Sequence, residues 1–151
     1  MNISLDNAFL RLDVNPSTAR WSIANRQRDD PFIEDIQINV QYHHGRKKFQ
    51  SLNHWNSPSI SDPVTTTSSQ GSARQIQISI GPDRGQLHYV LTFAILEESP
   101  LLLWKLSVEN QAQEPMLIDK VEMFSAGFIY KNRSGPTGKL HLSTNSESVS
   151  Y

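Results

Sequence analysis

Residues 76–95, IQISIGPDRGQLHYVLTFAI, decide the fold class of this 151-residue chain. Apolar side chains stand at every second position before and after the central GPDRG, and they are Ile76, Ile78, Ile80, Leu87, Tyr89, Leu91, Phe93 and Ile95. A period of two places such side chains on one face of a pleated strand, and a turn rich in glycine and proline between two runs favours antiparallel pairing. The stretch therefore predicts two paired strands that share one apolar face.

The same alternation continues toward the N-terminus. The apolar positions are Ala8, Leu10, Leu12 and Val14, then Trp21 and Ile23 after a turn at 15–18, and Ile36, Ile38, Val40 and Tyr42 after a predicted break at 29–31. The first two runs predict a hairpin, and the third predicts a strand that ends at a tip around 43–45. Residues 51–72 are rich in Ser, Thr, Asn and Pro. They predict a loop, with a short edge strand at 64–68.

Toward the C-terminus, a turn at 97–100 precedes a run with Leu102, Trp104, Leu106 and Val108 on one parity. Leu101 and Leu103 stand on the opposite parity, so we expect the start of this strand to be buried on both faces. After a polar turn at 110–115, the apolar positions Met116, Ile118, Val121 and Met123 change parity near 119–120, which predicts a β-bulge. Leu140 and Leu142 begin one further predicted strand.

Strands of about five to ten residues, separated by turns and unaccompanied by an amphipathic helix, are typical of antiparallel sheets packed face to face. We therefore predict an all-β antiparallel sandwich. Nothing divides the chain, so residues 1–151 are expected to form a single domain. Trp21 and Trp104 follow the strand parity and are expected in the core.

Composition restricts the function and the compartment. The chain has no cysteine, so burial of apolar side chains must stabilise it, and a reducing compartment is favoured. The first twelve residues lack the pattern of a secretory signal, and we expect a cytoplasmic protein. The longest apolar runs, such as 101–104, are far shorter than the ~20 residues that span a bilayer. A formal charge of −1 predicts no membrane and no nucleic-acid partner.

Reactive side chains do not form a recognisable catalytic or metal site. His43 and His44 are adjacent, so a strand would point them to opposite faces, and a solvated hairpin tip is the expected role. The carboxylate pairs at 29–30 and 97–98 stand in predicted turns rather than across a cleft. The basic run at 46–48 is typical of a solvated strand edge. We therefore predict no catalytic residue, no metal and no cofactor.

Trp55 is the candidate for carbohydrate contact. Sugar rings stack on tryptophan, and sugar hydroxyls need amide or carboxylate partners. Trp55 is flanked by Asn53, His54 and Asn56, which have this composition. Two interpretations stay open: these four residues contact a sugar, or Trp55 closes one end of the sandwich beneath a long loop.

The stretches SPLLLWKLSVEN at 99–110 and EPMLIDKVE at 114–122 carry a family resemblance. Together with the alternating strand at 87–96, they resemble the N-terminal β-supersandwich of α-galactosidase-like glycoside hydrolases, the melibiase group of family 36. The order of hairpins from Ile3 onward is also similar. Mutarotase-like sandwiches and the N-terminal domains of family 31 share similar patterns.

The resemblance implies a supersandwich related to galactose mutarotase, without catalysis of its own. In the family, the catalytic aspartates lie on a (β/α)₈ barrel that follows this domain, so no catalytic residue is transferred to this chain. We expect the chain to be the N-terminal part of a longer glycoside hydrolase, to pack on that barrel, and to take part in forming homo-oligomers. Carbohydrate would then be bound by the parent enzyme. A separate carbohydrate-binding module and a mutarotase-like epimerase using His and Glu are the alternatives.

Overall fold

The computed structural model describes residues 2–27, 30–51, 58–82, 86–125 and 128–129. Its strands are β1 (Ile3–Asp6), β2 (Leu10–Val14), β3 (Trp21–Asn25), β4 (Asp30–His44), β5 (Lys47–Gln50), β6 (Ser59–Ile60), β7 (Val64–Ser68), β8 (Gly71–Ile80), β9 (Leu87–Leu96), β10 (Leu102–Asn110), β11 (Met116–Ser125) and β12 (Phe128–Ile129). In these residues there is no helix that could cross a membrane.

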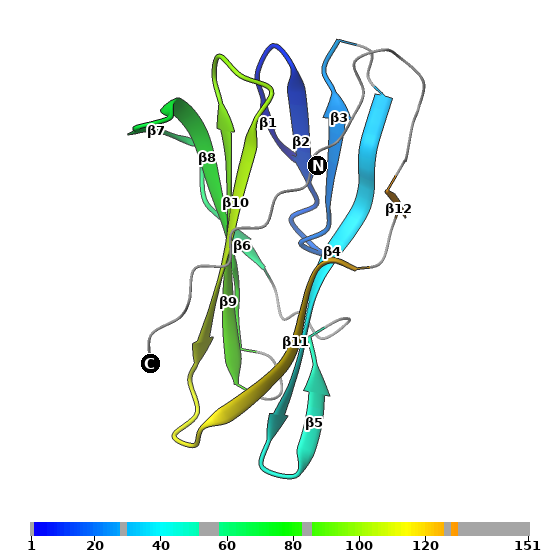
Figure 1. The fold of residues 1–151 in the computed structure, drawn as a ribbon, viewed down its shortest axis with the longest axis vertical. Coiled ribbons are helices and arrows are strands. Elements are labelled where there is room, and N and C mark those ends of the chain that lie inside the picture. Colours follow the sequence, from blue (N-terminus) through cyan, green and yellow to red (C-terminus); the bar gives the residue numbers. More distant parts are fainter. Residues whose placement is uncertain (1, 28–29, 52–57, 83–85, 126–127, 130–151) are drawn as a thin grey trace.

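The strands form two antiparallel sheets that face each other (Figure 1). One sheet has the order β1-β2-β3-β4-β11, and β5 and β12 also pair with β4. The other has the order β10-β9-β8-β6, and β7 also pairs with β8. The chain is therefore an all-β antiparallel sandwich, which confirms the predicted fold class.

The core lies between the two sheets and consists of the side chains on the predicted parity. In β9 the buried residues alternate with half-buried ones and are Leu87, Tyr89, Leu91, Phe93 and Ile95. Phe93 contacts Trp21 of the opposite sheet edge to face, with ring centroids 5.2 Å apart. Tyr42 of β4 is fully buried and stacks on Phe49 of β5. The predicted core position of Trp21 is thus confirmed, whereas Trp104 is only half-buried.

The central hairpin has the predicted pairing, since Ile76 lies opposite Phe93 and Ile78 opposite Leu91. The predicted hairpin of residues 10–14 and 21–23 is also present, as β2 and β3. The predicted bulge is confirmed by a shift of register between Ile118 and Lys120. The strand predicted from Leu140 and Leu142 lies outside the described residues.

Three details of the prediction are wrong. Within the predicted break at 29–31, Asp30 and Pro31 instead begin β4, and Pro31 lies opposite Ala24 next to a shift of register. Proline has no N–H to donate, and an irregular ladder tolerates it. Residues 51–72 are less loop-like than predicted, because β6, the expected edge strand β7 and the start of β8 fall within them.

The third wrong detail is burial on both faces at the start of β10. Leu101 is 51% exposed and Leu103 is 39% exposed. β10 is the end strand of its sheet, and Leu103 points away from the core because it lies between the inward residues Leu102 and Trp104. In a two-layer sandwich the outer face meets solvent unless another element covers it.

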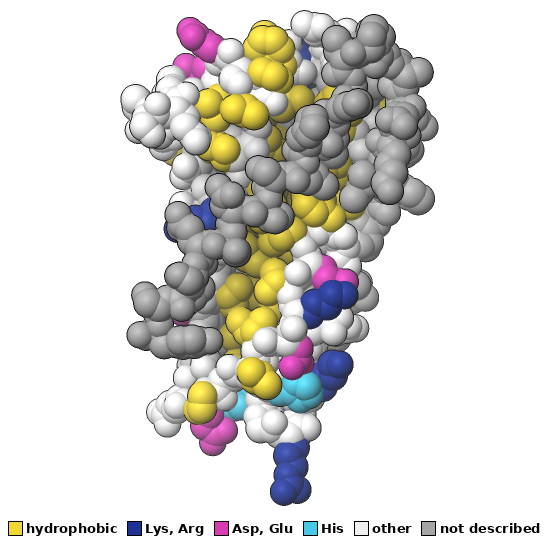
Figure 2. Space-filling view, viewed as in Figure 1, with side chains coloured by type: hydrophobic (Ala, Val, Ile, Leu, Met, Phe, Trp, Pro, Cys, Tyr) yellow, Lys and Arg dark blue, Asp and Glu magenta, His cyan; other side chains and the backbone are white. Residues whose placement is uncertain are grey.

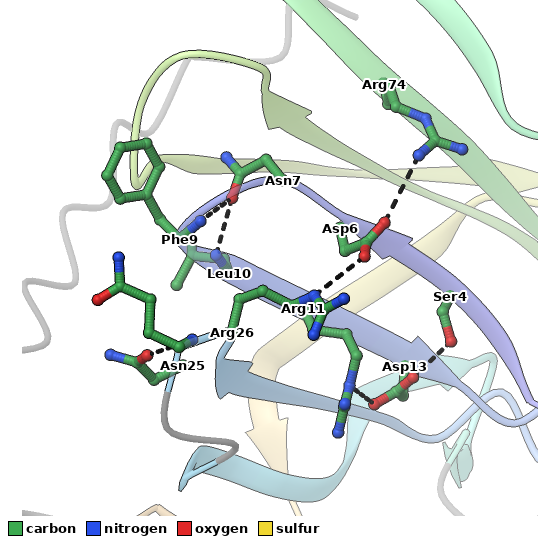
Figure 3. A network of polar contacts seen from close by, with 11 residues as sticks. Ser4, Asp6, Asn7, Phe9, Leu10, Arg11, Asp13, Asn25, Arg26 and Arg74 are labelled. Atoms are coloured by element: carbon green, nitrogen blue, oxygen red, sulfur yellow. Dashed lines mark hydrogen bonds and ion pairs between the residues drawn. The ribbon is translucent and has the colours of Figure 1, made fainter.

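Polar contacts of Asn7 tie the two sheets together at one end of the sandwich, and Figure 3 shows those within its own turn. The Asn7 side-chain amide donates to the carbonyl oxygens of Leu96 and Ser99, at 2.6 and 2.8 Å. Its Oδ1 accepts from the backbone N–H groups of Phe9 and Leu10, at 2.8 and 2.7 Å. One side chain therefore closes the β1–β2 turn and holds it against the end of β9.

Asp6 adds a second connection between the sheets beside Asn7. Its carboxylate lies 3.2 Å from Nε of Arg26 and 3.6 Å from a guanidinium nitrogen of Arg74, which belongs to β8 of the other sheet (Figure 3). All three side chains are 40 to 49% exposed, so solvent screens these ion pairs and their contribution to stability is small.

Candidate functional site

β10 and β11 together form one open side of the sandwich. They are consecutive in the chain, and each is the end strand of a different sheet. The inward residues of β10 alternate along the strand and pack against the core while staying half-buried, and they are Leu102, Trp104, Leu106 and Val108. Figure 2 shows hydrophobic side chains in a band that runs along the molecule on the side viewed in Figure 1. Among the described residues, the core is therefore incompletely covered along this side.

Aromatic contacts join the two strands across the open side. The ring centroids of Trp104 and Phe124 are 6.0 Å apart, and those of Phe124 and Trp21 are 5.4 Å apart. Both pairs have the edge-to-face geometry that aromatic rings favour. The C-terminal part of β11 is thereby anchored to the core.

Residues 117–121 of β11 carry three exposed apolar side chains. Ile118 lies opposite Tyr42 and Val121 opposite Val40, so both share the inner face of β4, yet they are 45% and 46% exposed. Leu117 lies opposite His43 on the outer face and is 66% exposed. We call Leu117, Ile118 and Val121 the β11 patch. Leu117 shares its face with the polar residues Lys120 and Glu122, which lie opposite Gln41 and Asn39.

A polar row lies on the outer face of β4 and β11, beside Leu117. Asn39 is 3% exposed and donates from Nδ2 to Oε2 of Glu122, at 2.8 Å. Nζ of Lys120 donates to Oε1 of the same carboxylate, at 2.5 Å. These hydrogen bonds, that from Lys120 above all, favour the ionised form and lower the pKa of Glu122 below its ordinary value of 4.5.

The lowered pKa of Glu122 predicts a loss of stability in acid. Its ionised carboxylate stabilises the folded state fully above about pH 4.5, and this contribution is lost as the pH falls toward and below the folded-state pKa. Urea unfolding of Glu122→Gln at pH 7 and at pH 3 checks this. We expect the variant to lose less stability between the two pH values than the wild type. Equal losses in both proteins would show that Glu122 does not contribute.

His43 and His44 form separate pairs with carboxylates rather than one site. Nδ1 of His43 lies 2.7 Å from Oδ2 of Asp119, and Nε2 of His44 lies 3.2 Å from Oε2 of Glu114. His43 and His44 point to opposite faces of β4, as expected, but both belong to the strand rather than to the turn beyond it. Within the described ranges no group of three or more His, Cys, Asp or Glu side chains is placed to hold a metal ion.

The other sequence candidates have varied outcomes. Asn53, His54, Trp55 and Asn56, the predicted carbohydrate contacts, lie outside the described residues. Residues 97–98 are exposed in a turn, as predicted. Of the pair at 29–30, Asp30 begins β4 instead of lying in a turn. In the basic run, Lys47 and Lys48 are exposed on β5, which agrees with a solvated edge.

Sequence reasoning found the change of parity between Ile118 and Val121 but missed the exposure of both side chains. The exposure depends on how far the opposite sheet extends, which alternation along one strand does not reveal. One signal was present, because Leu117 and Ile118 are adjacent apolar residues and must point to opposite faces. Such a pair indicates a strand that is apolar on both sides.

Comparisons with protein-family models, curated proteins and solved structures gave no match for this chain. The fold class accordingly rests on the structure. The resemblance to α-galactosidase-like enzymes rests on the sequence of residues 87–122 and the order of the hairpins.

Proposed function

We propose that this chain is a non-catalytic β-sandwich domain of an α-galactosidase-type glycoside hydrolase, and that it packs on the (β/α)₈ catalytic barrel of the parent protein. The sequence pattern of residues 87–122 supports the enzyme class. The β11 patch supports the packing role. Hydrolysis of terminal α-galactosides then belongs to the barrel, and the sandwich supplies a surface that supports it.

The observation that carries this proposal is the concentration of exposed apolar side chains on β11. Six large hydrophobic residues of the described chain are exposed, and three of them fall within the five residues 117–121. Single exposed apolar side chains are ordinary, so the proposal rests mainly on Ile118 and Val121, which share the inner face, while Leu117 adds an exposed apolar side chain on the opposite face of the same strand. Burial of a Leu, Ile or Val side chain contributes about 1.5–3 kcal/mol, so covering this patch yields a stable domain contact.

The enzyme class is tested by expressing two proteins, the product of the complete gene and the 151-residue chain. Both products are assayed with an aryl α-galactoside. We expect hydrolysis by the complete product and none by the chain alone. Hydrolysis by the chain alone, or a complete product with no segment long enough for a barrel, would contradict the proposal.

Variants of the β11 patch test the packing role. Leu117→Ser and Val121→Ser are expected to change the stability of the isolated chain by no more than about 0.5 kcal/mol each, because both side chains are about half exposed or more there. In the complete product each is expected to cost about 1–3 kcal/mol, because the side chain is then buried in the domain contact. Urea unfolding of both proteins gives the two values.

Val64→Ser is the matched control for these variants. Val64 is 50% exposed and lies on β7, an edge strand of the other sheet. Its substitution is expected to have the same small effect in both proteins. If the β11 variants behave as Val64→Ser does in the complete product, the patch does not contact the catalytic domain.

A further inference from the structure

β10 presents a long edge with which no further described strand pairs. It ends the five-stranded sheet, and β9 is the only described strand with which it pairs. The pairing runs from Leu102 to Asn110 without a shift of register, so the edge is regular along its whole length. Free N–H and C=O groups on such an edge form a template for another strand.

We propose that a second copy of this chain pairs with the β10 edge in antiparallel orientation, about a twofold axis at Ser107. The two five-stranded sheets would then join into one continuous sheet. A twofold contact of this kind brings the same surface of both copies together, so its charges must complement themselves.

The outward-facing charges of β10 meet this condition. Lys105 lies opposite Thr92 and Glu109 opposite His88, on the face of the sheet away from the core. Both residues are exposed, with the Glu109 side chain 70% exposed. With the axis at Ser107, Lys105 of each copy faces Glu109 of the other. Directly opposed side chains of opposite charge stabilise antiparallel pairing, and this contact contains the pair twice.

Neighbouring registers lack this complementarity. An axis at Lys105 would place the two lysines opposite each other, which is destabilising. An axis at Leu106 would place Lys105 opposite Ser107 and leave the charges unpaired. The Ser107 axis also places Leu106 opposite Val108 on the inner face, where both side chains are half-buried and apolar. Both faces of the strand therefore favour the same register.

This inference goes beyond the proposed function, because it rests on the edge and charges of β10 rather than on the β11 patch. Sedimentation equilibrium of the full 151-residue chain over a concentration series tests it. The wild type is expected to reach twice the chain mass of 17.1 kDa. Lys105→Glu and Glu109→Lys should each weaken the dimer by roughly 10- to 100-fold, because two attractive pairs become repulsive.

The double variant K105E/E109K restores opposite charges and is expected to return the dimer constant to within about threefold of the wild type. Circular dichroism confirms that each variant keeps its strands. Leu117→Ser is the control, since Leu117 lies on the outer face of the other sheet and should leave the dimer unchanged. Three results would each overturn the proposal: a monomeric wild type, a double variant that dimerises as weakly as the single variants, or dissociation of the dimer by Leu117→Ser. The proposed function is decided separately, by the α-galactoside assay and by the stability comparison of the complete product with the chain.

Discussion

Phe93→Ala is expected to lower the free energy of unfolding by about 3–5 kcal/mol, the range for truncating a buried phenylalanine. Phe93 is fully buried at the centre of β9 and contacts Trp21 across the two layers. Removal of the ring leaves a cavity and also breaks an aromatic contact between the sheets. Urea unfolding followed by circular dichroism measures the loss.

Leu103→Ala is the control for Phe93→Ala on the neighbouring strand. Leu103 is 39% exposed on the outer face of β10, and its removal is expected to cost less than about 1 kcal/mol. A loss at Leu103 as large as that at Phe93 would mean that the outer face of β10 is covered. The two-layer arrangement would then be incomplete at that point.

The second large effect is expected at Asn7, a polar residue. Asn7→Ala should cost about 2–4 kcal/mol, because it removes four hydrogen bonds that are each worth about 0.5–1.5 kcal/mol. Two of them join the β1–β2 turn to the carbonyl groups of Leu96 and Ser99. Their loss loosens the contact between the sheets at this end. Thermal unfolding of the variant gives the shift of the midpoint.

Asn15→Ala provides the comparison for Asn7. Asn15 also accepts a hydrogen bond within a turn, from the backbone N–H of Ser17 at 2.9 Å, but this contact is exposed and local. We expect a loss of about 0.5 kcal/mol. Similar losses at both positions would show that Asn7 acts only within its own turn and does not hold the sheets together.

Alternation of apolar residues was enough to predict the layers of this fold. Ile78, Leu91 and Val40 stand on the parity that becomes the core, because a pleated strand presents alternate side chains to one face. The bulge near Asp119 was also visible, since a change of parity requires an additional residue. These features depend on local geometry, which the sequence contains directly.

Features that depend on distant parts of the chain were not predictable in this way. Adjacent leucines at 101–103 resemble a strand buried on both faces, but whether anything covers the outer face is a tertiary property. Pro31 resembles a break because proline disfavours a regular ladder, and only the irregular pairing with β3 accommodates it. The contacts of Asn7 join residues 89 and 92 positions apart, which no local pattern indicates.

In the candidate site, too, local geometry was predictable from the sequence and tertiary surroundings were not. The inner-face positions of Ile118 and Val121 follow from parity, whereas their exposure follows from the position of β11 at the end of its sheet. We propose that a further protein body covers the exposed apolar side chains of β11.

Hydrogen exchange of β11 is the most direct test of this central claim. Backbone amides of Met116–Ser125 are followed by mass spectrometry in the 151-residue chain and in the complete gene product, with β7 as an internal reference. We predict that the β11 amides exchange at least about tenfold more slowly in the complete product, while those of β7 are unchanged. Equal exchange of β11 in both proteins would show that its exposed apolar side chains stay uncovered, and the domain-packing role would be wrong.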